Sequence, residues 1–96
     1  MNQGKDTKGK LTLTLVPPQI TKDIALVREY GTMKYGNADN WKSVDVVDYL
    51  NAMYRHLLEI VNGDLKSKDD ESGIEHYKHI ACNVAFICEL LKGDSK

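Results

Sequence analysis

The sequence predicts a small all-α protein, and three observations support this fold class. Three segments carry apolar residues at the three- and four-residue spacing that is typical of amphipathic helices. The composition is ordinary for a globular domain, with 42% hydrophobic residues. The length of 96 residues leaves room for one domain only. We therefore expect a bundle of three main helices over residues 11–92, preceded by a flexible tail over residues 1–10.

The first structured segment is expected to be an extended N-terminal arm. Residues 11–15, "LTLTL", alternate Leu and Thr with the period of two that is typical of a half-buried strand. A lone strand is not stable by itself, so it pairs with a second copy, packs as an arm, or is not a strand. Pro17 and Pro18 end this segment, and Pro18 also suits the first position of a helix.

The first helix is predicted to run from about Pro18 to Tyr30, with Ile20, Ile24 and Val27 on one apolar face. The helix can also continue to residue 35, where Gly36 is a suitable stop. The following "GNADNW" is rich in turn residues and is expected to be a connection.

The second helix is predicted over residues 44–62, with Ser43 as its N-cap. One face carries an apolar series at alternating three- and four-residue spacing, which we interpret as a core seam: Val47, Leu50, Tyr54, Leu57 and Val61. A second apolar stripe widens this face: Val46, Met53 and Ile60.

The third helix is predicted over residues 73–91, with Ser72 and Glu75 forming a capping box. Its core seam is expected to contain Ile74, Tyr77, Ala81, Val84, Cys88 and Leu91. Helices that are hydrophobic on more than one face need more partners than one short chain supplies. We therefore expect a homo-oligomer, a dimer or a tetramer, to complete the bundle.

Two polar clusters interrupt the apolar faces of the second and third helices. One contains Arg55, His56 and Glu59, and the other contains Glu75, His76, His79 and Asn83. An antiparallel pair of helices would bring the clusters together, with Asp69 and Glu71 in the loop between them. Such a set is consistent with a satisfied polar seam, a metal site or a phosphate-binding site. Asn83 in particular needs a hydrogen-bonding partner within its apolar surroundings.

The stretch "YGTMKYGNADNW" over residues 30–41 also stands out, because it combines aromatic residues with Lys34, Asn40 and Trp41. An aromatic ring beside an amide suits stacking on a nucleobase and reading of its edge. The alternative is that Tyr35 and Trp41 only pack the corner between the first two helices.

Several classes of protein do not fit the sequence. A net charge of −1 with interspersed acids and bases gives no basic surface for a nucleic acid polymer. The longest apolar stretch, "IACNVAFICELL", is too short and too polar to span a membrane, and no signal peptide is visible. Cys82 and Cys88 lie too far apart on one helix for a disulfide. We expect buried free thiols in a cytoplasmic protein.

Four stretches, read in order, are similar to one known family: "KLTLTLVPP", "YGTMKYGNADNW", "YRHLLEIVNGD" and "DDESGIEHYKHIACNVAFICEL". The chain resembles the phage dATP/dGTP diphosphohydrolases, a family linked to the MazG-like, all-α NTP pyrophosphohydrolases. The resemblance covers residues 10–91. It implies a MazG-like fold, a nucleotide ligand and a location in the cytoplasm of the host cell.

The resemblance also implies a divalent metal, Mg²⁺ or Mn²⁺, because MazG-like enzymes bind the metal with Glu-Glu-x-x-Glu and Glu-x-x-Asp segments. At the corresponding positions this chain has Arg55-His56-x-x-Glu59 and His76-x-x-His79, so only Glu59 of that set is present. Imidazole ligands suit Mn²⁺, Zn²⁺ or Fe²⁺ better than Mg²⁺. The expected metal ligands are therefore Glu59, Asp69, Glu75, His76 and His79.

The function that the resemblance implies is hydrolysis of dGTP or dATP to the monophosphate and pyrophosphate. Glu59 and His79 are the expected catalytic residues. The residues expected to bind phosphate or base are Lys34, Asn40, Trp41, Arg55, His56 and Asn83. The alternative is a non-catalytic phage protein that binds and sequesters a nucleotide or a cyclic-nucleotide signal.

Overall fold

A computed structural model describes residues 9–95 of the chain. It contains three α-helices, α1 (Gln19–Tyr35), α2 (Val46–Asn62) and α3 (His76–Leu91), and three short 3-10 turns, η1 (Leu13–Leu15), η2 (Asn40–Ser43) and η3 (Lys92–Ser95). The all-α prediction is confirmed. The predicted tail over residues 1–10 falls, except for its last two residues, outside the described part. No helix within the described part is long and apolar enough to cross a membrane.

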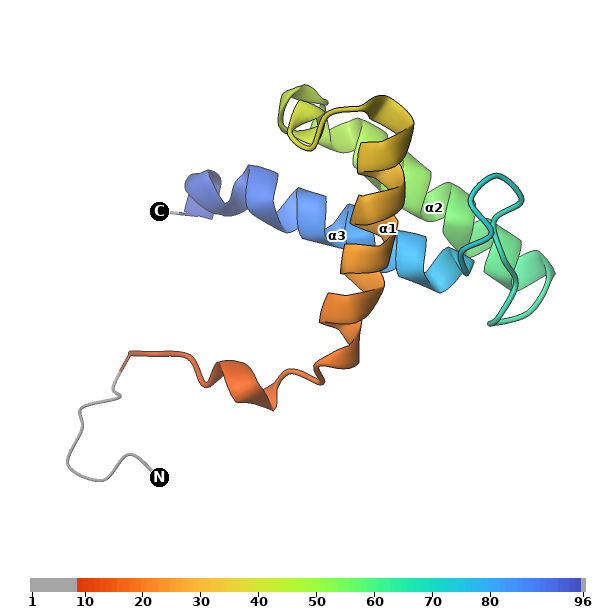
Figure 1. The fold of residues 1–96 in the computed structure, drawn as a ribbon. Helices are drawn as coiled ribbons and strands as arrows, with labels where there is room; N and C mark the ends of the chain where they lie inside the picture. The colour runs from red at the N-terminus through yellow and green to blue at the C-terminus, as the bar shows by residue number, and fades with distance from the viewer. Residues whose placement is uncertain (1–8, 96) are drawn as a thin grey trace.

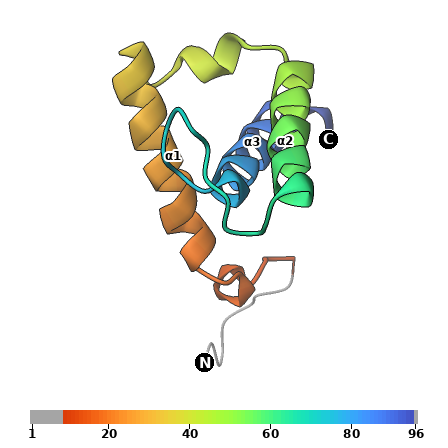
Figure 2. The same ribbon diagram turned by 90° about the vertical axis from the view of Figure 1, so that its right-hand side faces the viewer.

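Helix α3 lies at the centre of the arrangement and packs against both α1 and α2. Helices α2 and α3 run side by side in opposite directions, and α1 crosses α3 steeply (Figure 1). The loop over residues 63–75, which connects α2 to α3, turns back toward α1 (Figure 2). The three helices and this loop therefore surround a common space.

Helix α1 extends to the later of its two predicted stops. It begins one residue after Pro18 and ends at Tyr35, followed by Gly36 with a φ of 68°. Gly36 donates its backbone N–H to the carbonyl of Thr32 at 2.8 Å. Glycine adopts this left-handed conformation without steric penalty, so the "YG" at residues 35 and 36 ends the helix.

The predicted N-cap of α2 is wrong by two residues. Asp45 caps this helix, since its Oδ1 accepts a hydrogen bond from the Val47 amide at 3.0 Å. Ser43 instead belongs to η2, where its hydroxyl donates to the carbonyl of Asn40 at 3.0 Å. Because the Ser43 hydroxyl bonds within η2, it does not cap α2.

The predicted start of α3 and its capping box are also wrong. The helix begins at His76 and not at residue 73, and Glu75 precedes it without a side-chain capping bond. Gly73 has a φ of 71°, which interrupts any helix at that point. The Ser72 hydroxyl accepts a hydrogen bond from the Ile74 amide at 3.2 Å, so it stabilises this turn instead.

The predicted strand over residues 11–15 is wrong. Leu13–Leu15 form a 3-10 turn, in which the Leu15 amide donates to the carbonyl of Thr12 at 3.1 Å. Among residues 9–95 there is no strand with which "LTLTL" could form a ladder. The leucines of this arm are exposed, and the arm projects away from the helices (Figure 1).

The hydrophobic core is small and lies where α1, α3 and the turn before α3 meet. It consists of Val27, Ile74 and Cys82, with Ile24 and Phe86 among the partly buried residues packed against it. Burial raises the pKa of the Cys82 thiol to about 11, so this cysteine is a neutral core residue. Both cysteines are free, as predicted, but Cys88 is exposed, which corrects the expectation that both are buried.

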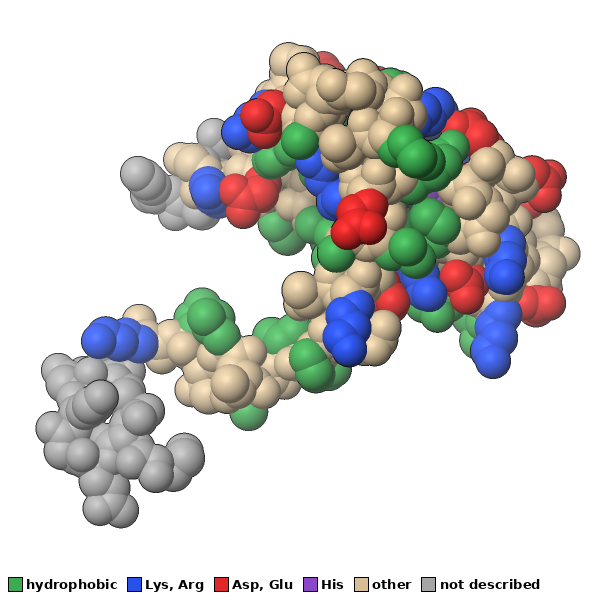
Figure 3. All heavy atoms as spheres, viewed as in Figure 1, with side chains coloured by type: hydrophobic (Ala, Val, Ile, Leu, Met, Phe, Trp, Pro, Cys, Tyr) green, Lys and Arg blue, Asp and Glu red, His purple; other side chains and the backbone are tan. Residues whose placement is uncertain are grey.

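The two predicted core seams lie largely on the outside of the domain. On α2, the series from Val47 to Val61 is exposed, whereas the second stripe of Val46, Met53 and Ile60 is half-buried. Of the predicted α3 seam, Ile74 is buried and Ala81 half-buried, whereas four members are exposed: Tyr77, Val84, Cys88 and Leu91. The buried residues within α3 are His76, Cys82 and Asn83. Periodicity identifies an apolar face but not the partner that it meets. Apolar patches consequently appear on the surface in Figure 3.

We expect Ile74→Ala to lower the free energy of unfolding by about 2–4 kcal/mol, because it removes a buried side chain from the small core. Ile74 is only 7% exposed. Urea denaturation followed by circular dichroism measures this change. Leu65→Ala is the control, since Leu65 is 74% exposed and its truncation should change the stability by less than about 0.5 kcal/mol. Equal effects of the two substitutions would contradict the assigned core.

Candidate functional site

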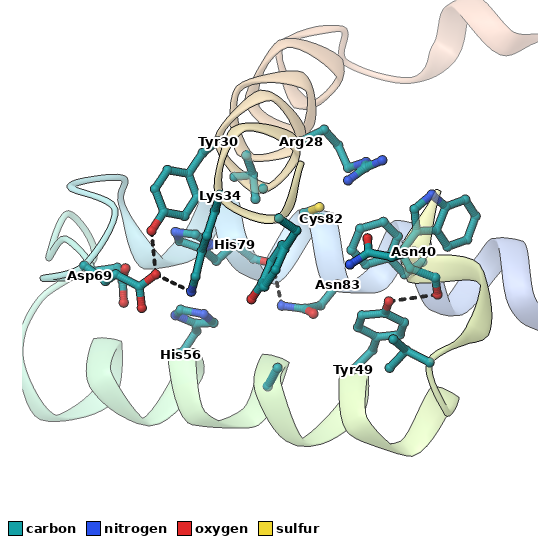
Figure 4. A pocket seen from close by; sticks show the side chains of 18 of the residues that line it. Arg28, Tyr30, Lys34, Asn40, Tyr49, His56, Asp69, His79, Cys82 and Asn83 are labelled. Carbon is teal, nitrogen blue, oxygen red and sulfur yellow. Dashed lines mark hydrogen bonds and ion pairs between the residues drawn. The ribbon is translucent and has the colours of Figure 1, made fainter. Parts of the chain in front are cut away.

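A cavity of about 560 Å³ lies between the three helices and the loop over residues 63–75. This volume is within the range of about 300–1,000 Å³ that is usual for small-molecule sites. Figure 4 shows Tyr30 and Lys34 reaching into it from α1, Tyr49 and His56 from α2, and Asn83 from α3. The cavity is therefore lined by side chains from all three helices.

One end of the cavity is aromatic. Trp41 stacks on Phe86 with the ring centroids 5.0 Å apart, and Tyr49 lies 4.6 Å from Phe86. The guanidinium of Arg28 lies 5.2 Å from the Phe86 ring, and the Tyr49 hydroxyl donates to the carbonyl of Trp41 at 2.9 Å. Trp41 thus packs the corner between η2 and α3, and it also lines the cavity together with Asn40.

The other end of the cavity is lined by His56 and His79, and His76 lies directly beside His56. Nδ1 of His56 lies 2.8 Å from Nδ1 of His76, and the ring of His56 stacks on that of His79 with centroids 4.6 Å apart. Burial, with the nearby His79 and His76, lowers the pKa of His56 to about 4, and burial likewise lowers the pKa of His79. Both rings are consequently neutral at neutral pH and can accept a proton or bind a metal.

Asp69 is held beside the histidines by a tight turn at the end of the loop. Its backbone N–H donates to the carbonyl of Ile74 at 2.9 Å, and its carboxylate accepts the Ser72 amide at 2.8 Å. Burial alone would raise the pKa of Asp69, but the bonds from Ser72 and the nearby histidines hold it below its usual value. The Ser72 hydroxyl also contacts Nε2 of His79 at 2.8 Å. An ionised carboxylate therefore faces the imidazole cluster.

The loop is attached to α1 through Glu71. The carboxylate of Glu71 accepts hydrogen bonds from the Tyr30 hydroxyl at 2.6 Å and from the Lys34 ammonium. Lys34 and then Tyr30 lower the pKa of Glu71 by these bonds. Glu71 thus closes one wall of the cavity, and it is not available as a metal ligand while this contact holds.

A second cavity, of about 380 Å³, adjoins the first at the histidine end. Arg55, His56 and Asp69 line both cavities. The residues that line only the smaller one are Glu59, Lys68, Asp70 and His76. Side chains that can bind a metal or a phosphate therefore lie at the boundary between the two cavities.

The structure brings nearly all of the predicted site residues to these two cavities. The larger one is lined by Lys34, Asn40, Trp41, Arg55, His56, Asp69, His79 and Asn83, and the smaller one also by Glu59 and His76. Glu75 is the exception, because its carboxylate lies 3.3 Å from the Lys78 ammonium and lines neither cavity. The partner of Asn83 is a backbone group: its Nδ2 donates to the carbonyl of His79 at 2.9 Å.

Sequence reasoning missed several residues of the larger cavity: Arg28, Tyr30, Tyr49 and Phe86. It also missed Ser72 as a partner of His79. A signal for Arg28 was present on α1. Arg28, Gly31 and Lys34 follow one another at intervals of three residues and share one face of the helix. This face therefore carries two cationic side chains, with a glycine that has no side chain between them. Tyr49 and Phe86 gave no such signal, because they resemble ordinary core positions.

The donor atoms at the boundary fit a divalent metal. Within the described residues, His56, Asp69 and His76 each offer one ligand atom, and these atoms all lie within 4.8 Å of one another. Two imidazole nitrogens and one carboxylate oxygen suit Mn²⁺, Fe²⁺ or Zn²⁺ better than Mg²⁺. Of the five ligands expected from the sequence, this group retains Asp69 and His76 and adds His56.

The profile of the family described as dATP/dGTP diphosphohydrolase, N-terminal, matches residues 1–96. The chain belongs to this family. A curated relative from Salmonella phage PMBT28, named dATP/dGTP diphosphohydrolase, is 38% identical over 87 residues. The match covers 91% of this chain but 29% of the relative, so the chain spans less than a third of that protein's length. No solved structure matches the chain.

We expect Glu71→Gln to loosen the loop over residues 63–75, because it weakens the charged contacts that attach the loop to α1. Hydrogen–deuterium exchange of the loop amides should become severalfold faster, while exchange within α3 should change little. Lys42→Gln is the control, since it removes an exposed ion pair with Asp39 in η2. Unchanged loop exchange in Glu71→Gln would show that other contacts hold the loop.

Proposed function

We propose that the protein takes part in hydrolysis of a purine deoxynucleoside triphosphate, dGTP or dATP, to the monophosphate and pyrophosphate. The observation that carries this proposal is the larger cavity, which has aromatic rings at one end and an ionised carboxylate beside neutral histidines at the other. The name of the Salmonella phage relative supports the substrate and the reaction. Because the chain spans only part of that relative, the activity is a proposal for this domain.

In this proposal the base lies at the aromatic end of the cavity. The half-buried Trp41 ring, which lines the cavity, supplies the stacking surface in this proposal. The Asn40 amide supplies a donor and an acceptor for the edge of a purine. The phosphates extend toward the histidines, where Lys34 and Arg55 neutralise part of their charge. The nucleotide is thus oriented along the cavity.

Hydrolysis requires that the attacking water lose a proton and that the phosphate charge be neutralised. His79 lines the cavity with a neutral ring and can accept the proton. Asp69 orients the water or holds a divalent metal, and Glu59 lines the smaller cavity beside it, where it can orient the water. A bound metal would polarise the phosphate and lower the pKa of the water.

The same proposal includes a cytoplasmic homo-oligomer, a dimer or a tetramer. The free thiols of Cys82 and Cys88 suit a reducing compartment. Many large apolar side chains are exposed on the single chain, including those of the arm and of α2. Burial against further copies would remove this surface from water.

A second candidate function is binding and sequestration of a nucleotide without turnover. One observation favours it: of the acids near the histidines, Glu71 is occupied by Lys34 and Tyr30, and Glu75 by Lys78. Asp69 is then the only carboxylate of the described residues that lies within the imidazole cluster. A cavity with several cations and few free carboxylates can hold a nucleotide without hydrolysing it.

Purified protein incubated with each dNTP and NTP, with Mg²⁺ or Mn²⁺, should release dGMP or dAMP and pyrophosphate, as resolved by ion-exchange chromatography. We expect Asp69→Asn to lower kcat by at least about 100-fold, because it removes a charged group at the reacting phosphates. Glu89→Gln is the matched control, since Glu89 pairs with Lys92 away from both cavities.

The same experiment separates the two candidate functions. Quenching of Trp41 fluorescence on addition of nucleotide would report binding, because Trp41 lines the cavity. Bound nucleotide that is recovered intact after heat denaturation would support sequestration. If the protein shows no binding and no turnover, both functions are ruled out for this domain.

A further inference from the structure

The boundary between the two cavities contains a group of three metal-binding side chains from three different parts of the fold. His56 comes from α2, Asp69 from the loop and His76 from the start of α3. Their ligand atoms all lie within 4.8 Å of one another. This set differs from the carboxylate-rich one expected from the sequence, since Glu59 and Glu75 are absent from it.

Each of the three side chains is held in place by a contact outside the group. The His76 amide donates to the carbonyl of Ser67 at 3.0 Å, and the His76 side chain is buried. The Ser72 backbone N–H donates a hydrogen bond to one carboxylate oxygen of Asp69. The ring of His56 lies parallel to that of His79, with an interplanar angle of 5°. Prior positioning of ligands lowers the entropy that is lost when a cation binds.

We propose that His56, Asp69 and His76 form a binding site for a divalent transition-metal cation, Mn²⁺, Fe²⁺ or Zn²⁺, in preference to Mg²⁺. Two imidazoles and one carboxylate on one side of an ion are the ligand set of sites that keep further positions open. His56 and Asp69 line both cavities, so the open positions face the space that a phosphate chain would occupy. Only the identity of that further ligand rests on the proposed function.

Metal binding can be measured without any nucleotide, so failure of the enzymatic proposal would not affect the result. Metal-stripped protein titrated with Mn²⁺ and followed by electron paramagnetic resonance should bind one ion per chain. An excess of Mg²⁺ should not displace it. Asp69→Asn and His76→Asn should each weaken binding by at least about 10-fold, as expected for loss of a ligand.

Glu75→Gln is the matched control, because Glu75 lies next to His76 in sequence but pairs with Lys78. It should bind Mn²⁺ as the unmodified chain does. Because His76 is buried and its replacement can disturb folding, a second measurement uses the unmodified chain. Electron spin-echo modulation from imidazole ¹⁴N on bound Mn²⁺ is expected. Absence of nitrogen coupling, or binding that depends on Glu59 and not on His76, would overturn the proposal.

An independent observation concerns the outward face of α2. The predicted seam, together with Leu58, forms an apolar stripe whose members are 41% to 70% exposed: Val47, Leu50, Tyr54, Leu57, Leu58 and Val61. Tyr49 and His56 point from the opposite side of the helix into the cavity (Figure 4). Within the described residues, this stripe has the spacing of a coiled-coil seam without a partner helix.

The stripe is symmetric about Tyr54. Val47 and Val61 lie seven residues before and after it, and Leu50 and Leu58 lie four residues before and after it. A two-fold axis at Tyr54 would therefore place Val47 against Val61, and Leu50 against Leu58, of an antiparallel second copy. A surface that is complementary to itself in this way suits a symmetric dimer.

Charge favours the antiparallel orientation. Asp45 and Asp48 lie at the start of α2, and its end is followed by Asp64, Lys66 and Lys68. An antiparallel pair brings the two acids at the start of one helix near the two lysines beyond the end of the other, and it aligns opposite ends of the helix dipoles. A parallel pair would place Asp48 beside Asp48. The six apolar side chains of the stripe are each at least 41% exposed, so two copies can bury them against one another.

We infer that two copies of the chain associate through the α2 stripe in an antiparallel pair. Sedimentation velocity should show an oligomer that Leu50→Glu dissociates, with its Kd raised by at least about 100-fold. Met33→Glu is the control, since Met33 is 77% exposed on α1 outside the stripe, and it should leave the assembly unchanged. A monomeric unmodified chain, or an oligomer that resists Leu50→Glu, would overturn the inference.

Cysteine cross-linking tests the orientation. In a Cys88→Ser background, which removes the exposed native thiol, Tyr54→Cys should form a disulfide-linked dimer on oxidation, because the axis passes through this position. Val47→Cys alone should not, because its counterpart would lie at the far end of the partner helix. Cross-linking through both positions would indicate a parallel pair and contradict the antiparallel arrangement.

Discussion

The inward face of α3 limits how closely the three helices can pack. The side chains on this face include three polar ones, His76, His79 and Asn83, in addition to Cys82. Polar groups lose hydration when they are buried, and they need partners that apolar side chains of α1 and α2 cannot supply. The helices therefore do not close on a continuous apolar core. They leave a cavity in which these groups meet one another, the backbone and the loop, and the apolar core shrinks to one corner of the domain.

This constraint explains which features the sequence could predict. The polar clusters predicted a meeting of the histidines, because residues that are three or four apart share a helix face whatever the tertiary structure. The predicted core seams were wrong for the same reason: spacing identifies two faces of α2 but not the one that meets α3. The roles of Ser72 and Glu75 depended on the positive φ of Gly73, which a capping-box pattern does not reveal. Tyr49 and Phe86 became site residues only through the packing of α2 and η2 against α3.

The two faces of α2 assign separate tasks to one helix. His56 and Arg55 contribute to the cavities, and the stripe through Tyr54 lies on the other side. If both proposals hold, substitutions on one face alter ligand binding without altering association, and the reverse. The relative from Salmonella phage PMBT28 is more than three times as long as the matched region, so in a longer chain the outward face could also meet other segments.

The three proposed metal ligands fall within 21 residues of chain, from His56 to His76, and none of them comes from α1. The larger cavity, in contrast, needs side chains from both ends of the domain. The proposed metal ligands thus come from the hairpin of α2, the loop and α3, for which the entropy of loop closure is small. Contacts of Glu71 with Tyr30 and Lys34 of α1 also hold this loop in place. The larger cavity is instead a long-range feature, because α1 supplies part of its lining and Glu71 joins the loop to α1.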